Sequence, residues 1–330
     1  MSQTIYAAIA GAGHYVPEKV LTNADLEKMV DTSDEWIRTR TGIRERRIAA
    51  EGELTSHMGA AAANMALEQA GIAAADVDAI YVATCTPDMI FPSTACLIQA
   101  ALGAEHAYGY DISSACAGFL MALDTAAAAI ESGRVKTALV IGAEKLSSVT
   151  DWTSRDTCVL FGDGAGAVVL TASDRPGLKS SMLGVDGNQA DILYIPAGGC
   201  KNPATEETVR QHQHYIHMAG RETFKIAVNT MVEAAQTAIS RAGLTADDIA
   251  WMIFHQANWR IIDAVAKRLG KGYVDRAVMN LDRYGNTSAA TIPIALSETV
   301  AEGKIKSGDN LLLVAFGGGL SWGGAVVEWL

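Results

Sequence analysis

The chain of 330 residues is long enough for two packed domains or for one large α/β unit. Hydrophobic residues make up 49% of it and charged residues only 19%, which excludes a disordered or fibrous protein. Lys and Arg number 26 against 37 Asp and Glu, and this net charge of −11 argues against a general nucleic-acid-binding protein.

The beginning of the chain and its apolar residues bear on its location. Residues 5–10 form a strand-like segment, without the charged and long apolar regions of a secretory signal. No run of 18 apolar residues occurs, so no membrane span is predicted. The five cysteines are scattered without a CxxC pair, which argues against disulfides and structural zinc. We therefore expect a soluble, cytoplasmic protein with reduced cysteines.

Along the chain, predicted Ala-rich helices alternate with short strands that are apolar throughout. Helices are expected at residues 58–69, from about 116 to 133 and at 224–241, and strands at residues 79–83, 137–141, 167–170, 251–254 and 311–315. Strands without a polar face are buried on both sides, so helices must cover both faces of each sheet. The pattern predicts an α/β fold.

The sequence also repeats itself at an offset of about half its length. Residues 70–77 (AGIAAADV) resemble residues 242–249 (AGLTADDI), and each copy lies between an Ala-rich helical stretch and an apolar strand. A second pair, Gly166-Ala-Val-Val and Gly324-Ala-Val-Val, follows in the same order. Two such pairs favour duplication over chance.

The duplication predicts two similar α/β halves, residues 1–172 and 173–330, joined near the polar segment 171–180. Residues 192–220 lack strong periodicity, and we expect them to form loops or a cap over a site.

Cys116 is the candidate nucleophile in the first half. A strand-like piece ends at Ser113 and Ser114, and an Ala-rich helix begins immediately, so the thiol lies in or beside the first helical turn. The free N–H groups and the helix dipole there are expected to lower its pKa. A buried packing cysteine is the alternative. The other four cysteines stand in apolar patterns and are interpreted as packing residues.

The second half holds two further candidates. His255 follows the apolar strand 251–254, at the carboxyl edge of a sheet, where α/β folds place their ligands. Asn286 stands in a polar turn before an apolar helix, and on its own it is as compatible with a helix cap. The histidines of the run 212–217 are more typical of a polar loop than of a metal site, because no Cys or carboxylate ligand pattern accompanies them.

Two Gly-rich segments, residues 161–166 and 316–324, are each followed by a strand rather than a helix. They therefore do not match a phosphate-binding loop. Close approach of two backbones, with N–H groups free to face an oxyanion, is the better interpretation.

Six motifs together closely resemble the β-ketoacyl-acyl-carrier-protein synthase III family, in order and over essentially the whole chain. They are Asp31-Thr-Ser-Asp-Glu-Trp-Ile-Arg-Thr-Arg-Thr-Gly-Ile-Arg-Glu-Arg, Ala115-Cys-Ala-Gly, Gly162-Asp-Gly-Ala-Gly, His255-Gln-Ala-Asn, Tyr284-Gly-Asn-Thr-Ser-Ala-Ala and Phe316-Gly-Gly-Gly-Leu-Ser-Trp-Gly. The resemblance implies a thiolase fold, with duplicated βαβαβαββ halves in a five-layer αβαβα architecture, and a homodimer.

The resemblance also implies an acyltransferase that initiates fatty acid biosynthesis. Its catalytic triad falls on Cys116 in the first half and on His255 and Asn286 in the second. Cys116 would take an acetyl or other short acyl group from CoA, and malonyl-acyl carrier protein would then condense with it, giving 3-oxoacyl-carrier protein, CO2 and CoA. His255 and Asn286 would donate to the malonyl thioester oxygen, and the N–H groups of Cys116 and Gly318 would form an oxyanion hole. No metal or cofactor is implied, because the CoA thioester is a substrate.

Binding residues are implied in the same way. CoA binding falls on Thr32, Trp36, Arg40, Arg155 and Asn258, with adenine between Trp36 and Arg155. Carrier-protein binding falls on Lys225, Arg260, Lys267, Arg268 and Lys271. The acyl pocket falls on Phe161, Ile216 and Phe91, the last reaching across the dimer. Arg221 departs from the family, since many relatives carry a small polar residue there.

Alternatives remain at this point. A related condensing enzyme of secondary metabolism, using another acyl-CoA primer or acceptor, would have the same triad. A non-enzymatic acyl-binding scaffold would be expected to lack the nucleophile, and Cys116 is present. A papain-like hydrolase would need a CG[SA]C[WY] motif that the chain lacks.

Overall fold

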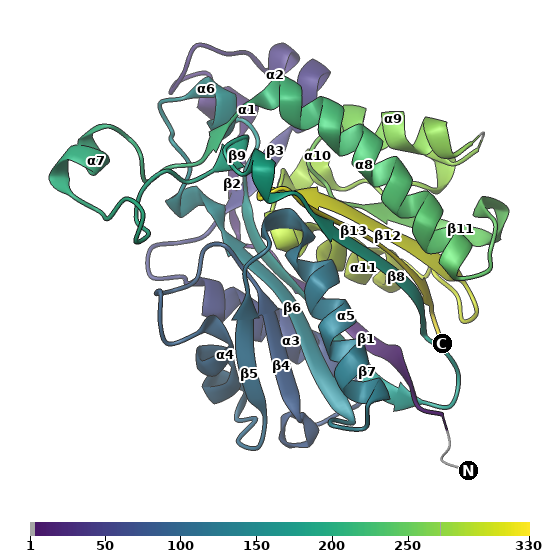
Figure 1. Cartoon of the computed structure of the whole chain (residues 1–330). Helices are drawn as coiled ribbons and strands as arrows, with labels where there is room; N and C mark the ends of the chain where they lie inside the picture. The colour runs from purple at the N-terminus through teal and green to yellow at the C-terminus, as the bar shows by residue number, and fades with distance from the viewer. Residues whose placement is uncertain (1–3, 271) are drawn as a thin grey trace.

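The computed structural model describes residues 4–270 and 272–330. Two β-sheets form its framework (Figure 1). The first has the order β1 (Tyr6–Tyr15), β7 (Asp163–Ser173), β6 (Thr137–Lys145), β4 (Ala79–Ala83) and β5 (Tyr108–Ile112). The second has the order β11 (Ile249–Phe254), β12 (Asn310–Gly317), β13 (Ser321–Glu328) and β8 (Leu178–Val185). Two small antiparallel pairs are β2 (Lys19–Thr22) with β3 (Glu45–Ile48), and β9 (Leu193–Tyr194) with β10 (His217–Met218).

Helices form three further layers around these sheets. α5 (Gly118–Glu131) and α11 (Thr291–Ala301) lie between the sheets, α3 (Thr55–Ala70) and α4 (Thr94–Leu102) cover the outer face of the first, and α8 (Gly220–Arg241) and α9 (Trp259–Leu269) cover the outer face of the second (Figure 1). Short helices are α1 (Asn23–Leu26), α2 (Asp34–Thr41), α6 (Arg155–Cys158), α7 (Glu206–Arg210) and α10 (Leu281–Tyr284). The predicted α/β class and αβαβα layering are confirmed.

The core explains why the strands carry no polar face. Every residue of β4 is buried, because α4 packs on one side of it and α5 on the other. Leu120 and Leu123 of α5 meet Leu311 and Leu313 of β12 in the central cluster. Burying a side chain of this size stabilises the fold by about 1.5–3 kcal/mol. This core fixes the strand ends that carry the candidate site.

The two sheets use different stretches of the chain. Strands of the first end by Ser173, and those of the second begin at Leu178. The predicted division into residues 1–172 and 173–330 as duplicated halves stays a prediction. Within the described residues, no helix is long and apolar enough to cross a bilayer.

Residues 192–220 behave largely as expected. They contain the β9–β10 pair and α7, and the α7 loop extends away from the body of the molecule (Figure 1). Leu193 and Gly220 stand near the two ends of this segment and line the cavity described next.

Candidate active site

Cys116, His255 and Asn286 line one cavity of about 450 Å³, although they come from three separate parts of the chain. Cys116 follows β5, His255 follows β11, and Asn286 lies between α10 and α11. The cavity is also lined by Phe161, Ile216, Asn258 and Gly318. The structure therefore brings together the predicted triad, both predicted oxyanion-hole residues and two of the three predicted pocket residues.

Cys116 lies in a 3-10 turn, Ala115–Ala117, rather than in α5 itself, which starts at Gly118. The side chain is buried, and burial raises the pKa of its thiol to about 12. A hydrogen bond from Ser288 acts in the opposite direction, and the nearby Glu144 raises the pKa further. The expectation that the helix start lowers this pKa is wrong, because loss of water around a thiolate outweighs a single helix end.

The end of β12 lies against the Cys116 backbone. A Cβ atom on Gly317 would stand 2.6 Å from the Cys116 amide nitrogen, so only glycine permits this approach. The Ser321 hydroxyl donates to Ser114 O at 2.9 Å and holds the β12–β13 turn to the chain just before Cys116. This packing places the Gly318 and Cys116 backbones at the same cavity.

His255 continues the parallel ladder, its amide donating to Val314 O at 2.8 Å. Its Nδ1 lies 2.7 Å from the Thr291 hydroxyl, which itself donates its one proton to Ser288 O at 3.0 Å. Thr291 must therefore accept from His255, which assigns the proton to Nδ1 and leaves a lone pair on Nε2. Burial lowers the pKa of His255 to about 3, so the ring is neutral at physiological pH.

The Asn286 side chain is oriented by its own loop. Its Oδ1 accepts from the Ser288 backbone N–H at 2.8 Å. Its own backbone N–H donates to Leu160 O at 2.8 Å, and its backbone carbonyl accepts from the Gly162 N–H at 3.0 Å. Since Oδ1 is held by backbone, the Nδ2 protons remain as donors for the cavity.

Beside Asn258, which lines the cavity and donates to Arg40 O, two guanidinium groups lie over one ring of α2; we call this surface the cavity mouth. The Cζ atoms of Arg40 and Arg155 stand 4.7 Å and 4.8 Å from the Trp36 ring centroid. The buried Thr32 hydroxyl nearby in sequence has no hydrogen-bond partner among the described residues. Asn258 caps α9 through Oδ1 and donates to Arg40 O at 3.0 Å. All five predicted CoA residues thus lie in α2, in the segments that flank it, at the start of α6 or at the cap of α9.

Exposed cations lie on the neighbouring helices α8 and α9. Arg260 stands over Phe224 at 5.7 Å, Lys267 pairs with Asp263 at 2.8 Å, and Arg268 donates to Asn229 at 2.7 Å. Lys225 and Arg221 are exposed on α8. Lys271, the fifth predicted carrier-protein residue, lies outside the described residues.

Comparison with known proteins identifies the family. The family models for 3-oxoacyl-[acyl-carrier-protein] synthase III match residues 110–187, and for its C-terminal part residues 239–329. β-Ketoacyl-[acyl-carrier-protein] synthase III of Roseiflexus sp. (strain RS-1) is 53% identical over 325 residues, 98% of each chain. The enzyme of Caldanaerobacter subterraneus subsp. tengcongensis is 53% identical over 330 residues, 100% of this chain and 99% of the relative.

The crystal structure of 3-oxoacyl-[acyl-carrier-protein] synthase III from Aquifex aeolicus VF5 superimposes with a TM-score of 0.90 at 48% identity, covering 98% of this chain and 99% of that one. The chain belongs to the β-ketoacyl-acyl-carrier-protein synthase III family. The predicted thiolase fold is confirmed. The protein is a condensing acyltransferase that initiates fatty acid synthesis.

Two features of this synthase bear on predictions outside the reaction centre. Phe91 does not line the cavity within its own chain; it is 83% exposed, beside Ile90 at 86%. His212 of the histidine run pairs with Asp151 at 2.8 Å. Throughout residues 4–270 and 272–330, no group of three His, Cys, Asp or Glu side chains is arranged to hold a metal ion.

Two residues beside the triad, Thr291 and Glu144, were not predicted from the sequence. Glu144 is fully buried at the end of β6, where its Oε2 accepts the Thr86 hydroxyl at 2.6 Å and the Cys85 amide at 3.0 Å. A lone acidic residue in an apolar strand was a usable signal for Glu144. Thr291 gave none, since its contact with His255 joins residues 36 apart in sequence.

Proposed function

We propose that this synthase condenses acetyl-CoA, or another short acyl-CoA, with malonyl-acyl carrier protein through an acyl-Cys116 intermediate. The observation that carries the proposal is the convergence of Cys116, a neutral His255 and the Asn286 amide on one cavity. A thiol, a base and two hydrogen-bond donors are the groups that this reaction requires.

In the first half-reaction, His255 Nε2 removes the thiol proton as Cys116 Sγ attacks the thioester carbon. The carbon–Sγ bond forms, the bond to the CoA sulfur breaks, and CoA leaves as a thiolate that takes a proton from solvent. The neutral thiol and neutral imidazole make proton transfer part of the attack, since neither group is ionised at rest. The N–H groups of Cys116 and Gly318 hold the developing oxyanion.

In the second half-reaction, the proton taken from Cys116 gives His255 a second donor. The malonyl carboxylate, an anion in the same cavity, keeps this proton on a ring whose resting pKa is about 3. Nε2–H and Asn286 Nδ2–H then bind the malonyl thioester oxygen, CO2 leaves, and its electron pair becomes the enolate. The enolate carbon attacks the acyl carbon, the bond to Sγ breaks, and Cys116 recovers its proton from His255. Apart from the proton that CoA takes from solvent, every bonding and proton-transfer step uses a protein group, so we propose that no metal or organic cofactor takes part.

CoA binding is proposed at the cavity mouth. Trp36 supplies a flat face for adenine, and Arg40 and Arg155 supply positive charge for its phosphates and ring. Arg155 stands too close to Trp36 for an adenine between them, so its side chain must move aside on binding. The unpartnered Thr32 hydroxyl offers a further donor.

The acidic carrier protein is proposed to dock on Lys225, Arg260, Lys267 and Arg268, next to the same mouth, with Lys271 continuing the patch in sequence. In a chain of net charge −11, this local excess of cations steers an acidic partner. We place the protein in the cytoplasm, where its CoA and carrier-protein substrates are made.

A homodimer is proposed through the edge of the first sheet. β5 is the edge strand, and Tyr108 and Tyr110 on it are exposed, as are Ile90 and Phe91 in the loop before α4. Exposed apolar side chains along an edge strand are typical of a protein interface. A second copy would cover them and bring Phe91 to the partner's acyl pocket.

A substrate panel tests the proposed function. Purified protein is assayed with malonyl-carrier protein and acyl-CoA primers of increasing length, and acetyl-CoA or another short primer is expected to give 3-oxoacyl-carrier protein. Condensation only with long or aromatic primers would contradict the assignment and favour a specialised condensing enzyme.

A further inference from the structure

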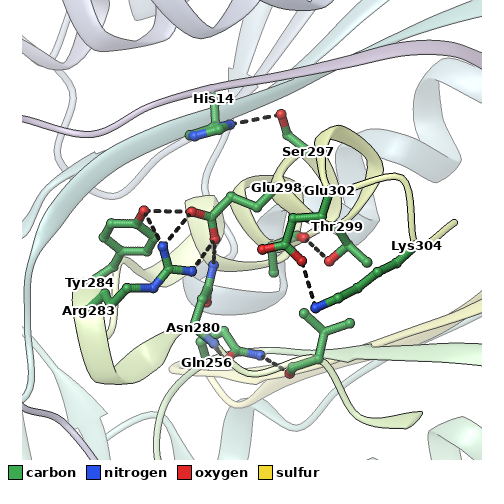
Figure 2. Close-up of polar contacts among 12 residues, drawn as sticks. His14, Gln256, Asn280, Arg283, Tyr284, Ser297, Glu298, Thr299, Glu302 and Lys304 are labelled. Carbon is green, nitrogen blue, oxygen red and sulfur yellow. Dashed lines mark hydrogen bonds and ion pairs between the residues drawn. The ribbon is translucent and has the colours of Figure 1, made fainter.

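The Glu298 carboxylate of α11 accepts four hydrogen bonds from α10 and from the residue before it (Figure 2). Its Oε1 accepts from the Tyr284 hydroxyl at 2.6 Å and from Arg283 Nη1 at 3.1 Å. Its Oε2 accepts from Arg283 Nη2 at 3.0 Å and from Asn280 Nδ2 at 2.8 Å. Charge-assisted bonds of this kind are short and strong, so both ends of α10 are fixed to one side chain.

α10 leads directly to Asn286. Tyr284 ends the helix, Gly285 follows with a φ of +65°, and Asn286 is the next residue. A displacement of the last turn of α10 therefore shifts the Asn286 backbone, and with it the direction of Nδ2.

α11 also supports His255, the second side chain proposed to bind the malonyl thioester oxygen. Thr291 at its start accepts from His255 Nδ1, and Glu298 lies seven positions later, which is about two turns and hence on the same face. Gln256, next to His255, adds a cross-connection, because its Oε1 accepts the Asn280 amide at 3.1 Å (Figure 2). One rigid helix thus spans the supports of both side chains.

We propose that Glu298 is a positioning residue that sets the place of Asn286 relative to His255. The inference rests on the proposed role of Asn286 as a donor to the malonyl thioester oxygen. Acylation of Cys116 uses His255 and backbone N–H groups but not Asn286. A substitution at Glu298 should therefore slow condensation and leave the acylation rate unchanged.

Glu298→Gln tests this with little change of shape. Losing the charge weakens the clamp on α10, and a small misplacement of a reacting group costs rate rather than binding. We expect kcat for condensation to fall roughly tenfold, with KM for malonyl-carrier protein and the rate of Cys116 acetylation changed by less than about twofold. Glu302→Gln is the matched control, because Glu302 lies one turn further on and pairs with the exposed Lys304.

The decisive readout is the same substitution in an Asn286→Ala background, where a residue that acts through Asn286 has no further effect on condensation. The inference would be overturned if Glu298→Gln slowed acetylation and condensation equally, or if it slowed neither. It would also be overturned if Glu298→Gln slowed condensation as much in the Asn286→Ala background as in the wild type. Tyr284→Phe, which removes one hydroxyl, gives the same test should Glu298→Gln fold poorly. If Asn286→Ala alone leaves condensation unchanged, the proposed function of Asn286 fails instead.

Discussion

The Cys116 thiol and the His255 imidazole are buried and neutral, whereas the polar groups around the cavity mouth are exposed and charged. The thiol and the His255 imidazole are both uncharged at rest because burial disfavours their ionised forms. The mouth presents Arg40, Arg155 and Arg260 to solvent.

The difference separates two tasks. Fixed donors in a dry cavity stabilise charge that develops only during the reaction, and they act where water cannot compete. Exposed cations attract charged substrates from a distance, and salt weakens them. Substitutions in the interior should therefore change kcat, and substitutions at the mouth should change KM and its salt dependence.

The largest expected effect is at the nucleophile. Cys116→Ser should lower acyl transfer by at least about 10³-fold, because a hydroxyl is a far weaker nucleophile towards thioesters. Decarboxylation of malonyl-carrier protein should persist and should accelerate as pH falls, since His255 must then take its second proton from solvent. Release of CoA and of CO2, measured separately between pH 8 and pH 5, checks both. A pH-independent decarboxylation would assign the donation to Asn286 alone.

The second effect concerns stability. The pKa of His255 is about 3 in the folded protein against 6.5 for the unfolded side chain, so the unfolded state binds the extra proton first as pH falls. The free energy of unfolding should therefore fall between pH 6.5 and pH 3, by about 1.4 kcal/mol per unit and by a few kcal/mol in all. Urea unfolding of the wild type and of His255→Gln at several pH values isolates the His255 contribution to this pH dependence. The variant should lack that contribution. Parallel pH profiles would contradict the assignment of a neutral, buried imidazole.

At the mouth, Arg260→Glu should raise KM for malonyl-carrier protein by roughly tenfold at low salt and leave the acetylation rate of Cys116 unchanged. The difference should shrink at high salt, because screening removes long-range attraction. Arg175→Glu, in the turn between β7 and β8, is the control for a change of charge alone. An effect on kcat that salt does not alter would break the division between interior and mouth.

The smallest effect is expected for Trp36→Ala. Loss of a half-buried stacking and cation–π surface costs about 0.5–1 kcal/mol, which corresponds to a two- to fivefold higher KM for acetyl-CoA. Titration of acetyl-CoA at saturating malonyl-carrier protein measures it. An unchanged KM would place the adenine elsewhere.

Local patterns were sufficient for much of the fold. The strand predicted at residues 79–83 is β4, and His255 does follow a buried strand at its carboxyl end, because runs of apolar residues report burial directly. The Gly-rich segments also serve close packing as expected. A Cβ atom on Gly166 would stand 2.6 Å from the Ile294 nitrogen of α11.

Other features depend on contacts between distant parts of the chain. The pKa of Cys116 was predicted in the wrong direction because the helix start is visible in sequence, whereas the burial of its side chain is not. The tautomer of His255 depends on Thr291, and the position of Asn286 depends on Glu298. Each contact joins side chains from two different elements of the fold. No spacing in the sequence indicates such partners.

The most direct test is to locate the acyl group on the protein. Purified enzyme is incubated with acetyl-CoA, and intact mass followed by peptide mapping finds the site of modification. The account predicts one acetyl group on Cys116 that disappears when malonyl-carrier protein is added. Acetylation of Cys85 or Cys158 instead, or an acetyl group on Cys116 that malonyl-carrier protein does not remove, would contradict it.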